Sequence, residues 1–289
     1  MTIWRSVYID KNARNAESYI LSILFFAISI KLLREFNLIS YFYPRIYFSN
    51  MNDYRTIFQK RANDYHTAMQ LYPNVRFHEF NHLISGCDFS GVTTILDVPS
   101  GGGYLKPYIP NHVTVHFADF SEGFTEEAVQ IVTPEELPFK NNSFDAVFSL
   151  SGMHHLKNVS QFVHECIRVT SVGGEFVFAD VKKDTNVAVF LNEFVNEYNS
   201  SGHHGDFFTE NYFDIHPTLQ NYNIVGQYHE YPFVFSDSHE MIHFFKLFFG
   251  LDKADHTIIY EGIHDILGLK TTSKGLEVNW GLLQFKIKK

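Results

Sequence analysis

The chain of 289 residues contains little cysteine and fewer basic than acidic side chains. Its two cysteines, Cys87 and Cys166, lie far apart and form no CxxC pair, which suits a reducing cytoplasm. With 23 Lys and Arg against 32 Asp and Glu, the formal net charge is -9. The sequence therefore offers no basic surface for nucleic acid or anionic lipid, and we expect a cytoplasmic protein without a nucleic-acid partner.

The sequence also lacks an apolar run of the roughly 20 residues that a membrane-spanning helix needs. The run Ser18–Ile30 is shorter, and Glu17 stands where a signal peptide would carry basic residues. We interpret residues 1–50 as an N-terminal extension with a short apolar helix, either amphipathic or buried. Membrane contact by residues 18–30 is not favoured.

What the sequence does have is a high apolar content, 45%, and an alternation of strand and helix patterns after Met51. The spacing predicts helices over residues 53–69, 75–86 and 159–170, and strands over residues 93–98, 113–119, 144–150 and 175–181. A turn is expected at Gly173 and Gly174. Alternating strands and helices form a parallel sheet, in which ligands bind beyond the carboxyl ends of the strands. We therefore expect an α/β fold.

The stretch TTILDVPSGGGYLKPYIP, residues 93–110, places three consecutive glycines soon after the first strand. A dinucleotide loop needs GxGxxG, but Lys106 stands at the position of the last glycine, and a phosphate loop of the GxxxxGK type is absent. Glycines at such a turn let the backbone approach a ligand where a side chain would collide. The cluster alone therefore predicts a close approach without identifying the ligand.

Further motifs around and after this loop narrow the choice of ligand. Asp97 precedes the glycines and Asp119 ends the next strand. EELPFKNNSFDAVFS and HECIRVTSVGGEFVFAD follow over residues 135–149 and 164–180. In order and in most spacings these motifs resemble the class I S-adenosylmethionine-dependent methyltransferases, in particular the small-molecule group with a methyltransferase type 11-like domain. The resemblance implies a Rossmann-like, seven-stranded, mostly parallel sheet with helices on both faces and a small helical cap.

The resemblance also implies S-adenosylmethionine as the cofactor and a role for each motif. The backbone at Gly101 and Gly103 would approach its amino acid moiety, and Asp97 would hydrogen-bond the loop or the ammonium group. Asp119 would accept hydrogen bonds from the ribose hydroxyls, which are strong because the acceptor is charged. The expected cofactor-binding residues are Tyr65, Asp97, Pro99, Ser100, Gly101, Gly103, Asp119, Phe120, Thr133, Glu136, Leu137 and Ser149.

Three departures from the family pattern concern the cofactor. Pro99 replaces the first glycine of the loop, and Thr133 stands where an acid usually contacts the adenine amino group. The stretch from Asp119 to Leu137 is short, so the helix and strand usually found there must be abbreviated. The adenine side of the pocket is therefore expected to be open. These departures favour an alternative, a degenerate methyltransferase-fold protein that serves as a binding or scaffold protein or as a cyclase.

Methyl transfer is a displacement at a sulfonium carbon, in which the enzyme supplies orientation and, for a hydroxyl or amine acceptor, a base. The acceptor is expected to be a small molecule, with oxygen slightly favoured. Histidine serves as a base near neutral pH. The candidates are His154, His155 and His203, and comparable residues are His204, His66 and Tyr65. No HExxH or Cys/His metal signature is present, so no metal is expected.

The resemblance implies that residues 51–289, the methyltransferase domain, contain three regions with different roles. Residues 93–180 are expected to form the cofactor-binding core, residues 181–250 the substrate and cap region, and residues 251–289 a C-terminal helix and edge strand. Residues 220–235 and 275–289 are expected to be the last two strands, as an antiparallel pair. The helical pattern over Ser238–Leu251 predicts a cap over the pocket or, alternatively, ordinary core.

A chain that begins at Met51 should fold and bind the cofactor like the full chain, because the helix over residues 53–69 starts the domain. Solubility and melting temperature of the two chains after cell fractionation test this expectation. A Met51 chain that is insoluble, or that melts far lower, would place residues 1–50 in the core. A full chain that pellets with membranes, unlike the shorter one, would contradict the cytoplasmic assignment.

Overall fold

The computed structural model describes residues 54–124, 128–214, 216–222 and 224–289. Over these residues eight strands form one sheet in the order β3-β2-β1-β4-β5-β8-β6, with β7 paired to β8. The strands are β1 Thr94–Asp97, β2 Thr114–Asp119, β3 Val129–Ile131, β4 Phe144–Leu150, β5 Thr170–Asp180, β6 Val225–Phe235, β7 Leu269–Thr272 and β8 Gly275–Lys288. The pairs among β1 to β5 are parallel, whereas β8 runs antiparallel to β5, β6 and β7. The mostly parallel α/β sheet expected from the sequence is confirmed.

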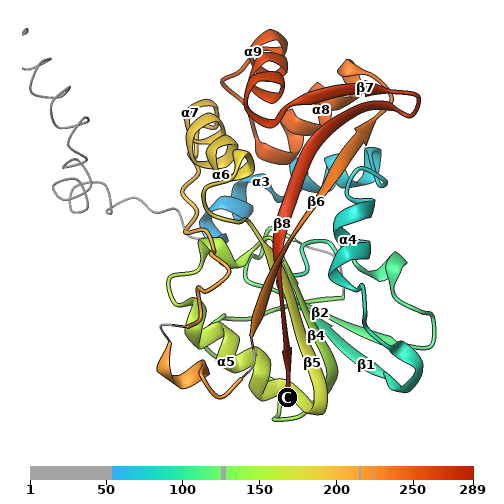
Figure 1. Ribbon diagram of the computed structural model, residues 1–289, viewed down its shortest axis with the longest axis vertical. Coiled ribbons are helices and arrows are strands. Elements are labelled where there is room, and N and C mark those ends of the chain that lie inside the picture. The colour runs from blue at the N-terminus through green and yellow to red at the C-terminus, as the bar shows by residue number, and fades with distance from the viewer. Residues whose placement is uncertain (1–53, 125–127, 215, 223) are drawn as a thin grey trace, which may run out of the picture. The chain divides into compact units, whose positions relative to one another are not determined.

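The sheet buries a separate apolar core on each face, because side chains alternate along a strand. Ile95 of β1 belongs to one core and its neighbour Leu96 to the other. The helices are α3 Tyr54–Leu71, α4 Phe77–Leu83, α5 Val159–Val169, α6 Asn186–Val189, α7 Asn196–Tyr198, α8 Ser238–Phe249 and α9 His256–Gly262. α4 contributes Phe80 to the first core and α5 contributes Phe162 to the second, so helices cover both faces (Figure 1).

Strand β1 is the point at which the sheet reverses its order. β2 pairs with one edge of β1 and β4 with the other. The segments that leave the carboxyl ends of β1 and β4 therefore return on opposite sides, and a crevice opens between them. The glycine loop directly follows β1, which places it at this crevice as the sequence predicts.

Three expected elements differ from the observed ones. The C-terminal strand, expected at the edge of the sheet, is β8, which lies inside the sheet between β5 and β6, so that β6 forms the edge. The helix expected over residues 75–86 is shorter, because α4 spans only Phe77–Leu83. Gly173 and Gly174 form an irregularity inside β5, rather than a turn before a strand that starts at residue 175. Gly173 has φ +82°, and a Cβ atom on Gly174 would meet the Asp145 carbonyl oxygen at 2.4 Å. A side chain at either position would disturb the pairing of β5 with β4.

Helix α8 lies against the cavity and also contributes to the apolar core. The segment Ser238–Leu251 therefore combines the two expected roles, a cap over the pocket and ordinary core. Its buried face presents Met241, Phe244, Phe245, Phe248 and Phe249. The Phe248 ring stacks on Tyr65 of α3 with ring centroids 4.6 Å apart. Asp237 caps the first turn by accepting a hydrogen bond from the Glu240 N–H, and Gly250 ends the helix in a left-handed conformation.

The helix expected over residues 18–30 lies outside the described residues. Within the described part of the chain, no helix is both long enough and apolar enough to cross a membrane.

Gly123 lets α3 pack against the turn after β2, so Gly123→Ala should destabilise the protein. An added Cβ atom would lie 2.1 Å from the Phe58 carbonyl oxygen of α3 and 2.9 Å from the Ala62 Cβ atom. Overpacking of this kind costs about 1–3 kcal/mol. Gly91→Ala is the matched control, because nothing lies within 4 Å of its added Cβ. The free energy of unfolding in denaturant should fall for Gly123→Ala and change by less than about 0.5 kcal/mol for Gly91→Ala. Equal stabilities of the two variants would contradict this packing.

Candidate active site

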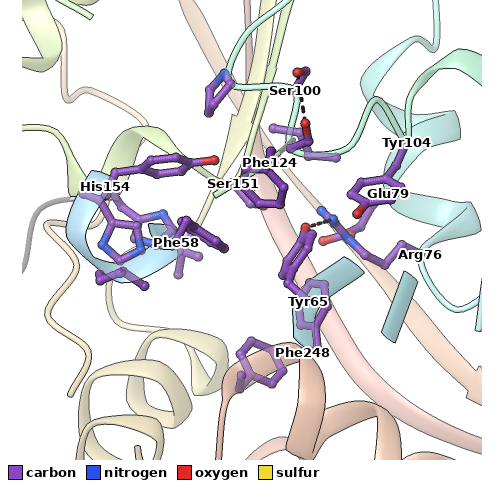
Figure 2. Close-up of a pocket in the computed structure, with 18 of the residues that line it drawn as sticks. Phe58, Tyr65, Arg76, Glu79, Ser100, Tyr104, Phe124, Ser151, His154 and Phe248 are labelled. Atoms are coloured by element: carbon purple, nitrogen blue, oxygen red, sulfur yellow. Dashed lines mark hydrogen bonds and ion pairs between the residues drawn. The ribbon is translucent and has the colours of Figure 1, made fainter. Parts of the chain in front are cut away.

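One cavity lies at the carboxyl ends of the parallel strands, between the loops that follow β1 and β4 and the helices α3 and α8 (Figure 2). Its volume is about 90 Å³. From the loops it is lined by Asp97, Pro99, Ser100, Gly101, Ser151, His154 and His155, and from the helices by Tyr54, Phe58, Arg61, Tyr65, Phe248 and Phe249. The cavity therefore has polar walls on the side of the sheet and largely aromatic walls on the side of the helices.

The glycine loop makes a tight turn that favours glycine. Gly101 and Gly103 have φ of +54° and +75°, a conformation that side chains rarely adopt. A Cβ atom on Gly102 would lie 2.6 Å from the Tyr104 hydroxyl oxygen, which itself lies 2.7 Å from Nδ1 of His66. The three glycines thus serve the turn and the packing of Tyr104 against it, and Gly101 also borders the cavity.

Asp119 holds the glycine loop in place and is closed off from the cavity. Its Oδ2 accepts hydrogen bonds from the Gly101 N–H at 2.8 Å and from the Tyr54 hydroxyl at 3.1 Å. Its Oδ1 accepts a hydrogen bond from the Ser121 N–H at 2.9 Å. Burial raises the pKa of Asp119 to about 6, although these hydrogen bonds oppose the rise. Asp119 does not line the cavity, because the Tyr54 side chain lies between its carboxylate and the cavity, and its expected role as the ribose ligand stays a prediction.

Asp97, at the end of β1, does line the cavity. It is 4% exposed, and burial together with the neighbouring Asp119 carboxylate raises its pKa well above the usual range. Arg76 acts in the opposite direction on the same carboxyl group. The polar wall therefore carries an acid whose charge depends on what binds beside it.

The residues expected on the adenine side lie outside the cavity. Thr133 donates a hydrogen bond to the Glu136 carbonyl oxygen at 3.2 Å, and the Glu136 side chain is exposed. The Leu137 N–H donates to Glu165 at 2.7 Å. Phe120 and Ser149 are buried beside the strand ends. Between β2 and Leu137 the described residues contain only the short strand β3, as the abbreviated spacing predicts.

The cavity thus brings together part of the predicted set. Eight predicted residues line it, namely Tyr65, Asp97, Pro99, Ser100, Gly101, His154, His155 and His203. Seven lie outside its wall, namely Gly103, Asp119, Phe120, Thr133, Glu136, Leu137 and Ser149. His204 is exposed and also lies outside.

The three catalytic candidates form one buried cluster. His154 and His155 lie on the turn after β4, and His203 follows α7. The ring centroids of His154 and His155 are 4.1 Å apart, and those of His155 and His203 are 5.0 Å apart. Burial lowers the pKa of His155 and of His203 well below the usual range, and the neighbouring His154 lowers both further. Both imidazoles are therefore neutral at neutral pH.

A buried ionic network in the wall was not predicted from the sequence. Arg76 donates to Glu79 through Nε and to the Tyr65 hydroxyl through Nη1, the latter at 2.5 Å. Glu79 also accepts a hydrogen bond from Trp280 Nε1 at 2.9 Å. The Arg76 guanidinium lies over the Phe248 ring at 5.2 Å. No local signal in the sequence pairs Arg76 with Trp280, because the fold alone brings these segments together.

Comparisons with known proteins agree with this architecture. Residues 96–178 match the family described as a methyltransferase domain. A relative, the uncharacterized methyltransferase YcgJ of Bacillus subtilis, is 29% identical over 119 residues, which cover 36% of this chain and 46% of that protein. A phthiotriol/phenolphthiotriol dimycocerosates methyltransferase of Mycobacterium leprae is 34% identical over 62 residues, 22% of this chain and 23% of that protein.

Solved structures show the same fold at low sequence identity. The crystal structure of YcgJ superposes with a TM-score of 0.53 at 18% identity, covering 74% of this chain and 99% of that one. A S-adenosylmethionine-dependent methyltransferase of Thermotoga maritima gives a TM-score of 0.52 at 14% identity, covering 81% of this chain and 99% of that one.

These findings agree with the resemblance seen in the motifs: residues 96–178 match a methyltransferase domain, and the fold is shared with the solved structures of YcgJ and of the S-adenosylmethionine-dependent methyltransferase from Thermotoga maritima. The chain spans less than half the length of the curated relatives it matches. Its acceptor and partners therefore have to be argued from its own site.

Proposed function

We propose that this chain binds S-adenosylmethionine in the cavity and transfers the methyl group to a small-molecule acceptor, with an oxygen nucleophile slightly favoured. The observation that carries the proposal is the juxtaposition of the glycine loop and the histidine cluster in the wall of one cavity. The loop suits the cofactor and the cluster suits the acceptor. Methyl transfer requires these two partners to be held in line with each other.

The residues on the loop side fit the polar end of the cofactor. The backbone at Ser100 and Gly101 borders the cavity without an intervening side chain at the glycine. Asp97 offers a carboxyl group for an ammonium, and Arg76 contributes positive charge nearby. When bound, the cofactor supplies the sulfonium methyl group.

The cavity must open for the cofactor to enter. Its volume of about 90 Å³ is below the roughly 300–1,000 Å³ of typical ligand pockets. We infer that the start of α3 moves outward on binding, since Tyr54 covers Asp119 there. That motion would expose the Asp119 carboxylate to the ribose hydroxyls.

The acceptor would lie between the aromatic wall and the histidines. Phe58, Phe124 and Phe248 line the cavity and suit an apolar or aromatic acceptor body. A neutral imidazole in the cluster can accept the proton that a hydroxyl acceptor loses as its oxygen attacks the methyl carbon.

A second candidate function is ligand binding without methyl transfer, as a scaffold protein or a cyclase. The burial of Asp119 behind Tyr54 and the position of Thr133 outside the cavity favour it. Both observations concern the ribose and adenine side, where binding of the cofactor would fail first.

Calorimetric titration with S-adenosylhomocysteine tests the proposal, with Gly101→Ala as the diagnostic variant. The full chain should bind, and Gly101→Ala should bind at least about tenfold more weakly, because the loop backbone can no longer hold its turn. Gly86→Ala is the matched control, since Gly86 also has positive φ, +76°, but nothing lies within 4 Å of an added Cβ. Absence of binding by the unaltered chain would contradict the proposal and favour the second candidate.

The affinity for S-adenosylhomocysteine should fall as the pH is lowered through about 6. Ribose hydroxyls that donate to Asp119 favour its charged form, so binding releases the proton that the free protein holds below its pKa of about 6. The contribution of Asp119 to the affinity should be constant above pH 7 and fall about tenfold between pH 7 and pH 5. The Asp119→Asn variant should still fold, but its affinity for S-adenosylhomocysteine should lack this dependence on pH. A variant with the same pH profile as the unaltered chain would exclude Asp119 as the ribose ligand.

A further inference from the structure

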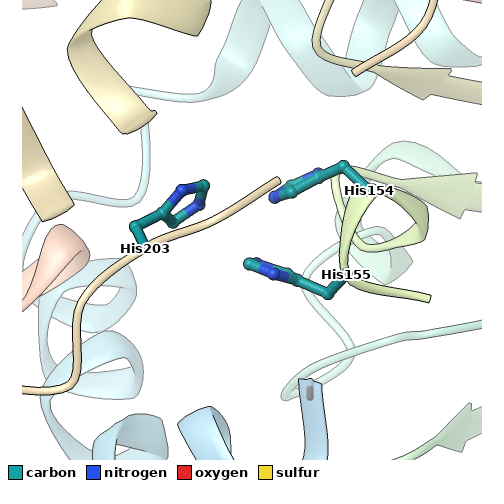
Figure 3. A group of neighbouring side chains, drawn as sticks. All are labelled: His154, His155 and His203. Atoms are coloured by element: carbon teal, nitrogen blue, oxygen red, sulfur yellow. The ribbon is translucent and has the colours of Figure 1, made fainter. Parts of the chain in front are cut away.

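Three histidine side chains converge in the wall of the cavity, and their ligand nitrogens lie within 4.8 Å of one another. Figure 3 shows the rings of His154, His155 and His203 pointing toward a common centre. All three are buried, with at most 7% of each residue exposed. Two of them are adjacent in sequence and the third belongs to a distant segment, so no contiguous metal-binding motif in the sequence reveals the cluster.

We propose that these three imidazoles bind a divalent transition-metal ion, with Zn²⁺ as the best-fitting ion. The expectation of no metal rested on the absence of HExxH and Cys/His spacing. The present proposal rests instead on the positions of the three side chains in the folded protein.

The first support is the orientation of His154 by Asp180. The Nδ1 atom of His154 lies 2.6 Å from Asp180 Oδ1, at the end of β5. The second oxygen, Oδ2, accepts the backbone N–H groups of Met153 and His154 at 2.9 and 3.2 Å. A carboxylate fixed in this way takes the proton of Nδ1 as a hydrogen bond, which leaves the lone pair on Nε2. A carboxylate behind a histidine is the usual outer partner of a metal-binding imidazole.

The second support is the orientation of His203 by Asn192. The Asn192 amide has a defined orientation, because its Nδ2 donates to the Gly205 carbonyl oxygen at 2.9 Å and its Oδ1 accepts the Gly205 N–H at 2.8 Å. The His203 Nδ1 atom lies 3.0 Å from that same Oδ1. Because Oδ1 is an acceptor, Nδ1 of His203 must donate. The lone pair of His203 therefore also lies on Nε2.

The third support is an unsatisfied group on His155. Among the described residues, its buried Nδ1 atom has no hydrogen-bond partner. An unpaired buried polar atom is destabilising and calls for an explanation. A ligand that fills the space between the three rings provides one.

The donor set selects the kind of ion. Imidazole nitrogen suits Zn²⁺, Cu²⁺, Ni²⁺ and Fe²⁺ rather than Mg²⁺ or Ca²⁺, which prefer oxygen. Three protein ligands leave the fourth position of a tetrahedral Zn²⁺ open, as in catalytic rather than structural sites. With Zn–N bonds of about 2.1 Å the nitrogens would stand roughly 3.4 Å apart. The ligand nitrogens, which lie within 4.8 Å of one another, would have to move closer by roughly 1 Å to reach that spacing.

An ion here would activate an oxygen acceptor, an inference that rests on the proposed function. The cluster and the glycine loop line the same cavity, so the open position faces the acceptor space. A bound divalent ion lowers the pKa of a coordinated hydroxyl by several units. The acceptor hydroxyl would give its proton to solvent, its oxygen would bond to the methyl carbon, and the carbon–sulfur electron pair would remain on sulfur. The metal then replaces the imidazole as the activating group, and the substrate class becomes metal-coordinating hydroxyl compounds.

Metal binding by the full chain tests the site directly. After dialysis against a chelator, titration with Zn²⁺ should show one site per chain, and Co²⁺ should give the visible absorption of a tetrahedral nitrogen-coordinated ion. His155→Ala and His203→Ala should each weaken Zn²⁺ binding at least about 100-fold, and His155→Gln should do the same with less change in volume. His204→Ala is the control, because this neighbouring exposed histidine lies outside the cluster. Far-ultraviolet circular dichroism checks that each variant is folded.

The outcomes separate this inference from the proposed function. Binding of S-adenosylhomocysteine by a chain that takes up no Zn²⁺ overturns the metal site alone. Zn²⁺ binding without S-adenosylhomocysteine binding supports the metal site and overturns the methyltransferase proposal. Equal loss of Zn²⁺ in His204→Ala and His155→Ala would show surface binding and overturn the site.

Discussion

The buried carboxylate of Asp119 joins three parts of the molecule that are distant in sequence. One of its oxygens holds the glycine loop through the Gly101 N–H and the start of α3 through Tyr54, and the other holds the turn after β2 through Ser121. A carboxylate satisfied by three donors can remain buried, because each hydrogen bond offsets part of its desolvation. The closed form of the cavity depends on this arrangement. Under the proposed function the same carboxylate accepts hydrogen bonds from the ribose hydroxyls, so closure of the cavity and binding of the cofactor would oppose each other.

Three acidic residues at the carboxyl ends of strands have different structural roles around the crevice. Asp97 ends β1 and faces the cavity, Asp119 ends β2 and fixes the loop, and Asp180 ends β5 and fixes the turn that carries His154. Parallel strands bring their carboxyl ends to one edge, so residues far apart in sequence meet there. The aromatic helices α3 and α8 then cover this edge, with Phe248 against Tyr65. A cavity with a polar wall on the side of the sheet and an apolar wall on the side of the helices suits a charged cofactor together with a less polar acceptor.

Much of the fold could be predicted from the sequence, because strand and helix periods and the order of motifs are local signals. The stretch Phe144–Leu150 forms a strand with the expected bounds, and the residues from Tyr54 to Leu71 form the expected helix. The site was predictable only in part. The resemblance gave Asp119 the role of ribose ligand, but Tyr54 covers its carboxylate, and the docking of a helix leaves no local signal in the sequence. The meeting of His203 with His154 and His155 is likewise a product of the fold.

The central claim is that the cavity under α3 receives S-adenosylmethionine when the bond between Tyr54 and Asp119 opens. A crystal structure of the chain with S-adenosylhomocysteine tests it most directly. We expect the amino acid moiety beside Gly101 and Asp97, the ribose hydroxyls on the Asp119 carboxylate with Tyr54 displaced, and the sulfur directed toward the histidine cluster. A ligand bound elsewhere, or one bound while the Tyr54 hydroxyl still donates to Asp119, would contradict it.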